Sequence, residues 1–214
     1  MVHPAYIHQM ITVDRPRCPW CRVSNETYRN YHDFEWGRPV DNDQQLFEAL
    51  TLEIFQAGLS WECILQRRAA FRKAFCHFDY QVVAQYTSSY VEELMVCSDI
   101  IRHRGKIEAT INNAKVFIHI QQEFTSFRHY LDVQTGGQRI VEWDKSRSAL
   151  SDLLSADLKK RGMKYVGTTT IYSFLQAIGI IYSHVPECWL HGLSEDLRET
   201  PANKRQETDC IVRI

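Results

Sequence analysis

The chain has 214 residues, of which 44% are hydrophobic and 24% charged, an ordinary usage for a globular protein that excludes wholesale disorder. Its formal net charge is −1, so any contact with nucleic acid must come from a local basic patch. The apolar stretches are too short for a membrane span of about 20 residues, and the N-terminus lacks the apolar core of a secretory signal, which favours a cytoplasmic protein.

The spacing of apolar residues predicts a mostly α fold. Residues 1–17 are expected to form an N-terminal extension and residues 191–214 a polar tail, which leaves one helical domain over 18–190. Strand-like alternation is weak except for a short piece near 139–143. Apolar residues three or four apart predict helices that begin near Asp41 or Asp43 and end at Gly58, and others over 60–75, 91–95, 107–118, 150–158 and 171–182.

Glu53 interrupts the apolar face of the first predicted helix. It shares that face with Leu46, Leu50 and Ala57, and a carboxylate turned toward a core costs several kcal/mol unless it is hydrogen-bonded or lines a polar cavity. Two interpretations stay open. Glu53 is either a structural residue that caps a neighbouring helix, or a carboxylate at the floor of a ligand pocket.

Aromatic residues are dense in the sequence around this glutamate. A carboxylate surrounded by tyrosine and tryptophan suits a flat ligand that is cationic or forms hydrogen bonds, through stacking and cation–π attraction. The alternative is that the rings belong to the hydrophobic core. The residues concerned are Tyr28, Tyr31, Trp36 and Trp61.

Two groups of metal-binding residue types stand at opposite ends of the domain. Cys18 and Cys21 form a CxxC pair that His32 follows, and His184 and Cys188 are spaced as H-x3-C. Four ligands drawn from these residues would make a tetrahedral zinc site joining the two ends. Ordinary buried thiols together with a redox-active CxxC would give the same pattern.

The segment from Leu158 to Thr170 predicts a helix, a turn with two glycines and a new helix beginning at Thr168. Gly162 and Gly167 let the backbone approach another surface closely, and the new helix presents free N–H groups to an anion. A helix-hairpin-helix grips a DNA phosphate in this way without reading sequence. A solvated basic turn between two helices is the alternative. The basic side chains beside the turn are Lys159, Lys160, Arg161 and Lys164.

Together these segments resemble the bacterial 3-methyladenine DNA glycosylase I family. The similarity runs in order from about residue 17 to residue 188. The matching strings are Arg17–Trp20 (RCPW), Tyr31–Gly37 (YHDFEWG), Leu52–Trp61 (LEIFQAGLSW), Ile100–Ile107 (IIRHRGKI), Asp157–Gly162 (DLKKRG) and Val166–Thr168 (VGT), followed by Gln176–Ala177, His184 and Cys188.

The resemblance implies an all-α helix-hairpin-helix DNA glycosylase with a structural Zn²⁺ that joins the N- and C-terminal regions. In the family, the tryptophan at the Trp61 position stacks on the excised base, and the glutamate at Glu53 recognises its edge. The implied zinc ligands are Cys18, His32, His184 and Cys188, with Cys21 as a competitor for one position. The implied base pocket consists of Tyr28, Tyr31, Trp36, Glu53 and Trp61.

The resemblance also implies a reaction, the hydrolysis of the N-glycosidic bond of 3-methyladenine in double-stranded DNA. The products are the free base and an abasic site, and a monomer is expected. The hairpin, with Gly167 and Thr168, would hold phosphates, and the base would be flipped out while Leu59, beside Gly58, fills the gap. No Asp occurs between Leu158 and Glu195 to act as the catalytic Asp that many such glycosylases carry after the hairpin. The positive charge of the alkylated adenine weakens the N-glycosidic bond, so the reaction can proceed without this Asp.

The sequence departs from the family's pattern over about 127–148, where the usual segment rich in Trp, Phe and Pro is shortened. The change leaves the named pocket residues in place and is expected to alter a wall of the pocket or of the DNA groove. Two other functions stay as alternatives: a catalytically impaired homologue that binds damaged DNA, and a zinc-containing helical protein with no DNA role. Base release would separate the first from an enzyme, and salt-dependent DNA binding would argue against the second.

Overall fold

The computed structural model describes residues 15–192. Most of the expected N-terminal extension and of the expected polar tail therefore lies outside the described residues. Within them most of the chain is helical, which confirms the mostly α prediction, and two short strands are also present. No helix among residues 15–192 is long and apolar enough to cross a membrane.

Side-chain caps explain where several helices begin. Ser60 caps α4 at the start of the helix predicted over 60–75, and Asn42, between Asp41 and Asp43, caps α3. The elements in chain order are α2 (Glu26–Phe34), α3 (Asp43–Gln56), α4 (Trp61–Ala74), the short 3-10 helix η1 (Cys76–Phe78), α5 (Tyr80–Val83), α6 (Ser88–Val96), α7 (Arg104–Phe124), α8 (Phe127–Thr135), β1 (Ile140–Val141), α9 (Ala149–Lys160), α10 (Thr168–Ala177) and β2 (Ile181–Tyr182).

The prediction of one helix over 171–182 is wrong in its second half. α10 stops at Ala177, and Gly179 turns the chain, with a φ of +75°, toward β2. A Cβ at Gly179 would lie 2.6 Å from the backbone carbon of Arg38, so this close approach requires glycine. β2 is buried and pairs in parallel with β1, so the apolar residues after the turn continue as a strand.

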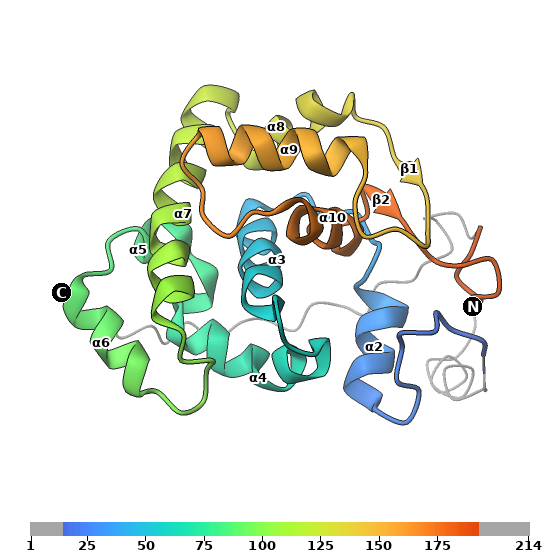
Figure 1. Cartoon of the computed structure of the whole chain (residues 1–214), viewed down its shortest axis with the longest axis horizontal. Coiled ribbons are helices and arrows are strands. Elements are labelled where there is room, and N and C mark those ends of the chain that lie inside the picture. Colours follow the sequence, from blue (N-terminus) through green and yellow to red (C-terminus); the bar gives the residue numbers. More distant parts are fainter. Residues whose placement is uncertain (1–14, 193–214) are drawn as a thin grey trace, which may run out of the picture.

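The main hydrophobic core lies around α3, α7 and α10. In Figure 1, α3 stands in the middle of the molecule with α7 on one side and α10 on the other, while α9 lies above them. α10 packs on both α9 and α3, and α7 packs on α3 and α8. Any side chain that leaves the inner face of α3 is therefore surrounded by other elements.

The N-terminal loop and α2 form a second apolar region beside this core. It contains one small cluster around Tyr28 and Tyr31, and another around Cys18 and Cys188. Trp20 and Trp36 pack against both clusters and connect them. Candidate site residues from both ends of the chain therefore collect where α2 meets α4 and the segment after β2.

Candidate functional site

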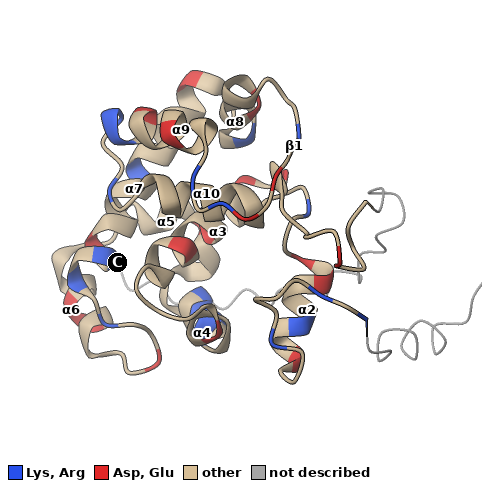
Figure 2. Ribbon diagram, turned by 45° about the vertical axis from the view of Figure 1, so that its right-hand side comes forward, with Lys and Arg blue, Asp and Glu red and all other residues tan. Residues whose placement is uncertain are grey.

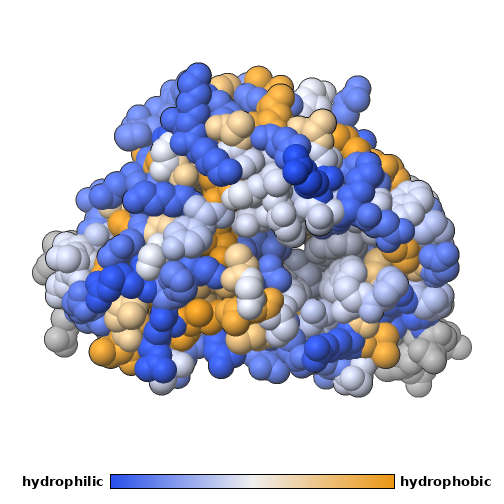
Figure 3. Space-filling model, in the orientation of Figure 1, coloured by the Kyte–Doolittle hydropathy of each residue, from blue (hydrophilic) through white to orange (hydrophobic). Residues whose placement is uncertain are grey.

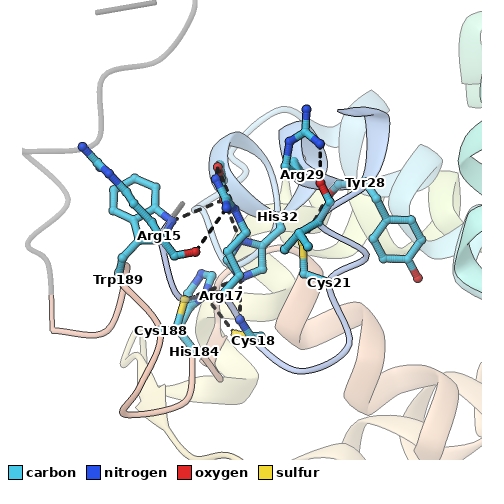
Figure 4. Close-up of polar contacts among 12 residues, drawn as sticks. Arg15, Arg17, Cys18, Cys21, Tyr28, Arg29, His32, His184, Cys188 and Trp189 are labelled. Carbon is cyan, nitrogen blue, oxygen red and sulfur yellow. Dashed lines mark hydrogen bonds and ion pairs between the residues drawn. The ribbon is translucent and has the colours of Figure 1, made fainter. Parts of the chain in front are cut away.

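Four sulfur and nitrogen donors from distant parts of the chain converge beside α2. Cys18 precedes α2, His32 lies in its last turn, and His184 and Cys188 follow β2. Their ligand atoms all lie within 4.8 Å of one another, and each residue is at most 3% exposed. Figure 4 shows the four side chains turned toward one point. Cys21, the competitor named from the sequence, is not part of this cluster.

The distances within the cluster fit a tetrahedral metal. His184 Nδ1 lies 3.4 Å from Cys18 Sγ and 3.5 Å from Cys188 Sγ, and His32 Nε2 lies 3.5 Å from Cys188 Sγ. Around zinc, with bonds of about 2.3 Å to sulfur and about 2.0 Å to nitrogen, neighbouring sulfur and nitrogen donors stand about 3.5 Å apart. Two cysteines and two histidines are also a donor set typical of structural zinc.

Hydrogen bonds hold this cluster in place from outside. His32 Nδ1 lies 2.7 Å from Asp33 Oδ1, and Arg17 Nη2 donates to Asp33 Oδ2 at 2.8 Å. Burial alone would raise the pKa of Asp33, but the hydrogen bonds to His32 and Arg17 lower it to about 2. An ionised Asp33 orients the imidazole of His32 so that Nε2 faces the cluster.

An aromatic cluster lies next to these four residues. Trp20 stands at its centre, with its ring centroid 5.8 Å from that of Tyr28, 6.3 Å from Tyr31 and 4.8 Å from Trp36. Tyr31 in turn lies 5.1 Å from Trp61, the first residue of α4. The structure thus brings together the four aromatic residues that the resemblance assigns to a base pocket.

Trp20 is a member of this cluster that the sequence analysis missed. The position of Trp20 between Cys18 and Cys21 could have indicated it. A metal bound by this loop would bring the Trp20 indole to the rings of α2. Trp36 also contacts the Cys/His cluster, because its ring centroid lies 4.8 Å from that of His184. The aromatic cluster and the metal-binding cluster therefore share a wall.

Glu53 is a buried carboxyl beside this aromatic cluster. It is 6% exposed, and no hydrogen bond or ion pair to its carboxyl is found among residues 15–192, so it caps no helix there. Burial raises its pKa to about 8. Burial and, second, the charge of Glu53 raise the pKa of the Tyr31 hydroxyl, so Tyr31 lies within electrostatic reach of this carboxyl. Trp61, whose ring packs against Tyr31, has its Nε1 buried without a partner in the described residues. An unpaired donor and an unpaired carboxyl on either side of one tyrosine indicate a ligand site.

The predicted hairpin lies between α9 and α10 and is held from α7 and α9. Asn113 Nδ2 donates to the Lys164 carbonyl at 2.9 Å, while Asn113 Oδ1 accepts from the Lys164 N–H at 2.8 Å. The Ser155 hydroxyl donates to the Val166 carbonyl at 2.7 Å. Gly167 caps α10 without a side chain, so the first N–H groups of α10 have no side-chain acceptor. This leaves them available to an anion.

The basic residues beside the hairpin are not equivalent. Lys159, Lys160 and Lys164 are exposed, and Figure 2 shows basic residues at the end of α9 where the hairpin begins. Arg161 instead pairs with Glu123 at 2.5 Å and with Asp157 at 2.7 Å. The guanidinium of Arg161 is therefore already engaged within the protein, whereas the three lysines face solvent.

A buried lysine holds the turn between α3 and α4. Gly58 turns the chain with a φ of +87°, and Leu59 beside it is 39% exposed. Lys106, at the start of α7, donates from Nζ to the carbonyls of Phe55 at 3.0 Å and Ala57 at 2.8 Å. It thereby satisfies carbonyls at the C-terminal end of α3. Lys106 lies within the matching string IIRHRGKI, but the sequence analysis assigned it no role.

If the chain excises a base, as the resemblance implies, replacing Lys106 by methionine should lower that activity by loosening this turn, because the carbonyls at the end of α3 would lose their donor while the apolar stem is kept. We expect about a 10-fold loss in catalytic rate, and arginine at this position should restore little because the site is buried. Single-turnover kinetics would be compared with the affinity for free base. If the affinity for free base falls as much as the catalytic rate, Lys106 supports the whole fold instead of the turn.

The comparisons with known proteins agree on one family. The family described as methyladenine glycosylase matches residues 20–191. The chain is 44% identical over 180 residues to DNA-3-methyladenine glycosylase 1 of Escherichia coli strain K12, covering 80% of this chain and 95% of that protein. A crystal structure of 3-methyladenine DNA glycosylase I is similar with a TM-score of 0.79 and 39% identity, over 82% of this chain and all of that one. A variant enzyme of this type in complex with 3-methyladenine has a TM-score of 0.75 and 34% identity, over 80% and 96% of the two chains.

Proposed function

The chain belongs to the methyladenine glycosylase family, and we propose that it removes 3-methyladenine from alkylated double-stranded DNA by hydrolysing the N-glycosidic bond. Its products are the free base and an abasic site. The observation that carries this function is the buried carboxyl of Glu53, which has no partner in the described residues and whose charge acts on Tyr31, the tyrosine that packs against Trp61. Such a group is costly to keep unless a ligand completes the site.

The electrostatics of Glu53 suit a cationic base. A carboxyl whose pKa is about 8 is mostly neutral at pH 7, and ionising it there costs free energy. The positive charge of 3-methyladenine in DNA offsets that cost by attracting the Glu53 carboxylate at short range, whereas neutral adenine does not. Trp61 and the tyrosines supply ring faces that attract a cation more strongly than a neutral base. Discrimination against undamaged adenine therefore comes from charge as well as from shape.

Catalysis follows from the same charge. The N-glycosidic bond of a cationic base is already weakened, so no residue need act as a strong acid on the leaving group. The ionised Glu53 stabilises the base in its cationic and departing form, and water attacks the sugar C1′. Rate is gained only from contacts stronger in the transition state than in the bound substrate. Glu53 is thus assigned as the catalytic residue, and the absence of an Asp after the hairpin is compatible with this route.

DNA is held at two places in this proposal. The N–H groups of α10 after Gly167, together with exposed lysines, bind phosphates of the damaged strand. Leu59 enters the stack as the flipped base leaves, and Gly58 allows the turn that presents it. Thr168 contributes through its backbone, because its hydroxyl donates to Asp152 at 2.6 Å.

The cluster beside α2 is assigned as a structural zinc site with Cys18, His32, His184 and Cys188 as ligands. The donor set and the distances support zinc, and Cys21 has no part in it. The zinc would supply stability, not chemistry, because all four positions belong to protein ligands. We place the enzyme in the cytoplasm as a monomer, with DNA as its macromolecular partner and no membrane attachment.

The function is tested by incubating methylated duplex DNA with the purified protein and identifying released bases by chromatography coupled to mass spectrometry. Release of 3-methyladenine is the expected result, and untreated DNA serves as the control. Folded protein that binds methylated DNA but releases no base would be an impaired binding homologue. Protein that neither binds nor releases would remove the DNA role altogether.

The lysines at the hairpin should determine the salt dependence of DNA binding. Replacing Lys159 and Lys160 together by glutamine should lower affinity for any duplex about 10-fold and reduce the slope of log K against log salt by about 1 to 2. Lys73→Gln, an exposed change in the last turn of α4, is the matched control. An unchanged slope in the double variant would move the phosphate contacts away from the hairpin.

A further inference from the structure

A cavity of about 330 Å³ lies beside the aromatic cluster and opens to solvent. It is formed where the end of α2, the end of α10 and the loop after β1 meet. Figure 3 shows the surface hollowed right of the centre, with mostly pale side chains around the hollow. The lining residues are Pro19, Trp20, Trp36, Trp143, Asp144, Lys145, Gln176, Ser183 and Val185.

This cavity is distinct from the pocket of Glu53. Trp20 and Trp36 line it, but Glu53, Tyr31 and Trp61 do not. Trp20 and Trp36 therefore belong both to the lining of the cavity and to the aromatic cluster. The cavity has a further indole of its own in Trp143, which belongs to the segment that departs from the family's pattern.

The charges of the cavity disfavour a phosphate. Lys145 is the cation of the lining, and its Nζ is paired with Glu142 Oε2 at 2.7 Å. Asp144 adds a negative charge. Because the lining has no unpaired cation in the described residues, it suits a neutral or cationic ligand.

The remaining groups suit a flat ligand with hydrogen-bonding edges. Three indoles offer ring faces for stacking, and each can also attract a cation. Gln176 Nε2 donates to the Ser183 hydroxyl at 2.8 Å, and that hydroxyl donates to the Glu142 carbonyl at 2.7 Å. These bonds orient the amide, and its Oε1 accepts no hydrogen bond in the described residues. The volume lies near the lower limit of small-ligand pockets, about 300–1,000 Å³.

The position of the cavity places it within reach of the damaged strand. Gln176 lies in the last turn of α10, and Thr168 begins α10 at the hairpin. The eight helical steps from Thr168 to Gln176 span about 12 Å of helix axis. A strand whose phosphate is bound at the hairpin therefore reaches the cavity within a few nucleotides.

We propose that this cavity is a second nucleobase site, in which an unstacked base lies against Trp143 with its edge toward Gln176. The inference rests on the proposed function and adds a step to it. The base comes either from the damaged strand or from the excised product, and the ligand chemistry, a planar purine, is the same. Trp143 is the residue to test, because Trp20 and Trp36 also belong to the inner pocket.

The test compares Trp143→Ala and Trp143→Phe with Val141→Ala, an exposed control on the same segment. The ring of Trp143 lies 5.5 Å from that of His191, whose Nδ1 lies 2.7 Å from the His184 carbonyl oxygen. Metal content and melting temperature are therefore measured for each variant. If Trp143→Ala loses metal, Gln176→Ala serves in its place.

The first arm uses a duplex with a stable abasic analogue and 2-aminopurine beside it in the same strand. We expect 2-aminopurine emission to change on binding wild-type protein. Trp143→Ala should reduce this change and weaken binding about 5- to 100-fold, the range of one base–aromatic stack. Trp143→Phe should retain most of it. This arm needs no catalysis, so it is independent of whether methylated bases are released.

The second arm titrates free 3-methyladenine into wild type, Glu53→Gln and Trp143→Ala by calorimetry. Two binding events, one lost in each variant, would assign the cavity to the excised base. One event together with a positive first arm would assign it to a base of the strand. If Trp143→Ala equals wild type and Val141→Ala in both arms, the cavity is not a nucleobase site and the proposal is overturned.

Discussion

Replacing Glu53 by glutamine is expected to lower kcat/KM for release of 3-methyladenine about 100-fold at pH 8, a loss comparable to removal of one aligned electrostatic contact in a closed active site. Glutamine has nearly the same shape but cannot ionise. The charge that balances the cationic base is therefore lost, while the rings around it remain. The loss should be smaller for binding of an abasic duplex, which presents no base to the pocket.

The pH dependence separates two roles for this carboxyl. If the ionised form acts, kcat/KM of the wild type rises up to 10-fold per pH unit below about 8 and levels off above it, because burial raises the pKa of Glu53 to about 8 in the free enzyme. The glutamine variant should be flat over the same range. A wild-type profile that instead falls above pH 8 would mean that neutral Glu53 donates a hydrogen bond to the base.

The same substitution should stabilise the protein at alkaline pH. The pKa of Glu53 is higher in the folded state than in the unfolded chain, so folding retains a proton that the unfolded chain releases between about pH 4.5 and pH 8. Stability is thus lost progressively as pH rises through that window. Glutamine has no such loss, and its gain in melting temperature should be small at pH 5 and largest above pH 8. Equal gains in melting temperature at both pH values would contradict a buried Glu53 carboxyl with a raised pKa.

Helices and the burial of Glu53 could be predicted because both are local consequences of spacing. Ser60 caps α4 as its residue type and position require, and Glu53 follows Leu46 and Leu50 into the interior. The end of α10 could not be predicted in this way, because apolar spacing continues past Ala177. What ends it is Gly179 against the Arg38 backbone, a contact between residues far apart in the chain.

The residues that spacing missed act through tertiary contacts. Lys106 looks like one member of a basic turn until its Nζ is found on the carbonyls of Phe55 and Ala57. Trp20 looks like a spacer in CxxC until its ring is found against Tyr28, Tyr31 and Trp36. In both cases the side chain has its effect on an element about 10 to 50 residues away, which no local periodicity records. The metal-binding residues were named from resemblance, since spacing alone left buried thiols equally open.

Removing the proposed zinc should have the largest effect on stability. We expect Cys188→Ser, or treatment with a strong chelator, to reduce bound zinc from one per chain to none and to lower the melting temperature by about 10–20 °C, the result of losing several kcal/mol in a domain of this size. The cluster is buried, and the hydrogen bond between the thiols lowers the pKa of Cys188 and raises that of Cys18. Without a metal, a buried thiolate would remain with only weak partners.

Removal of the proposed zinc should disturb mainly the aromatic wall of the base pocket. Trp36 lies against His184, and Trp20 follows the ligand Cys18, so both indoles should become mobile when the ligands separate. The main core around α3, α7 and α10 is a separate cluster and should keep its helices. Near-UV circular dichroism and base release should therefore fall, whereas far-UV dichroism should persist below the new melting temperature. Cys21→Ser is the matched control, because Cys21 lies outside the cluster, and it should retain one zinc. Metal-free protein that melts as the native protein does and still releases 3-methyladenine would exclude a structural zinc.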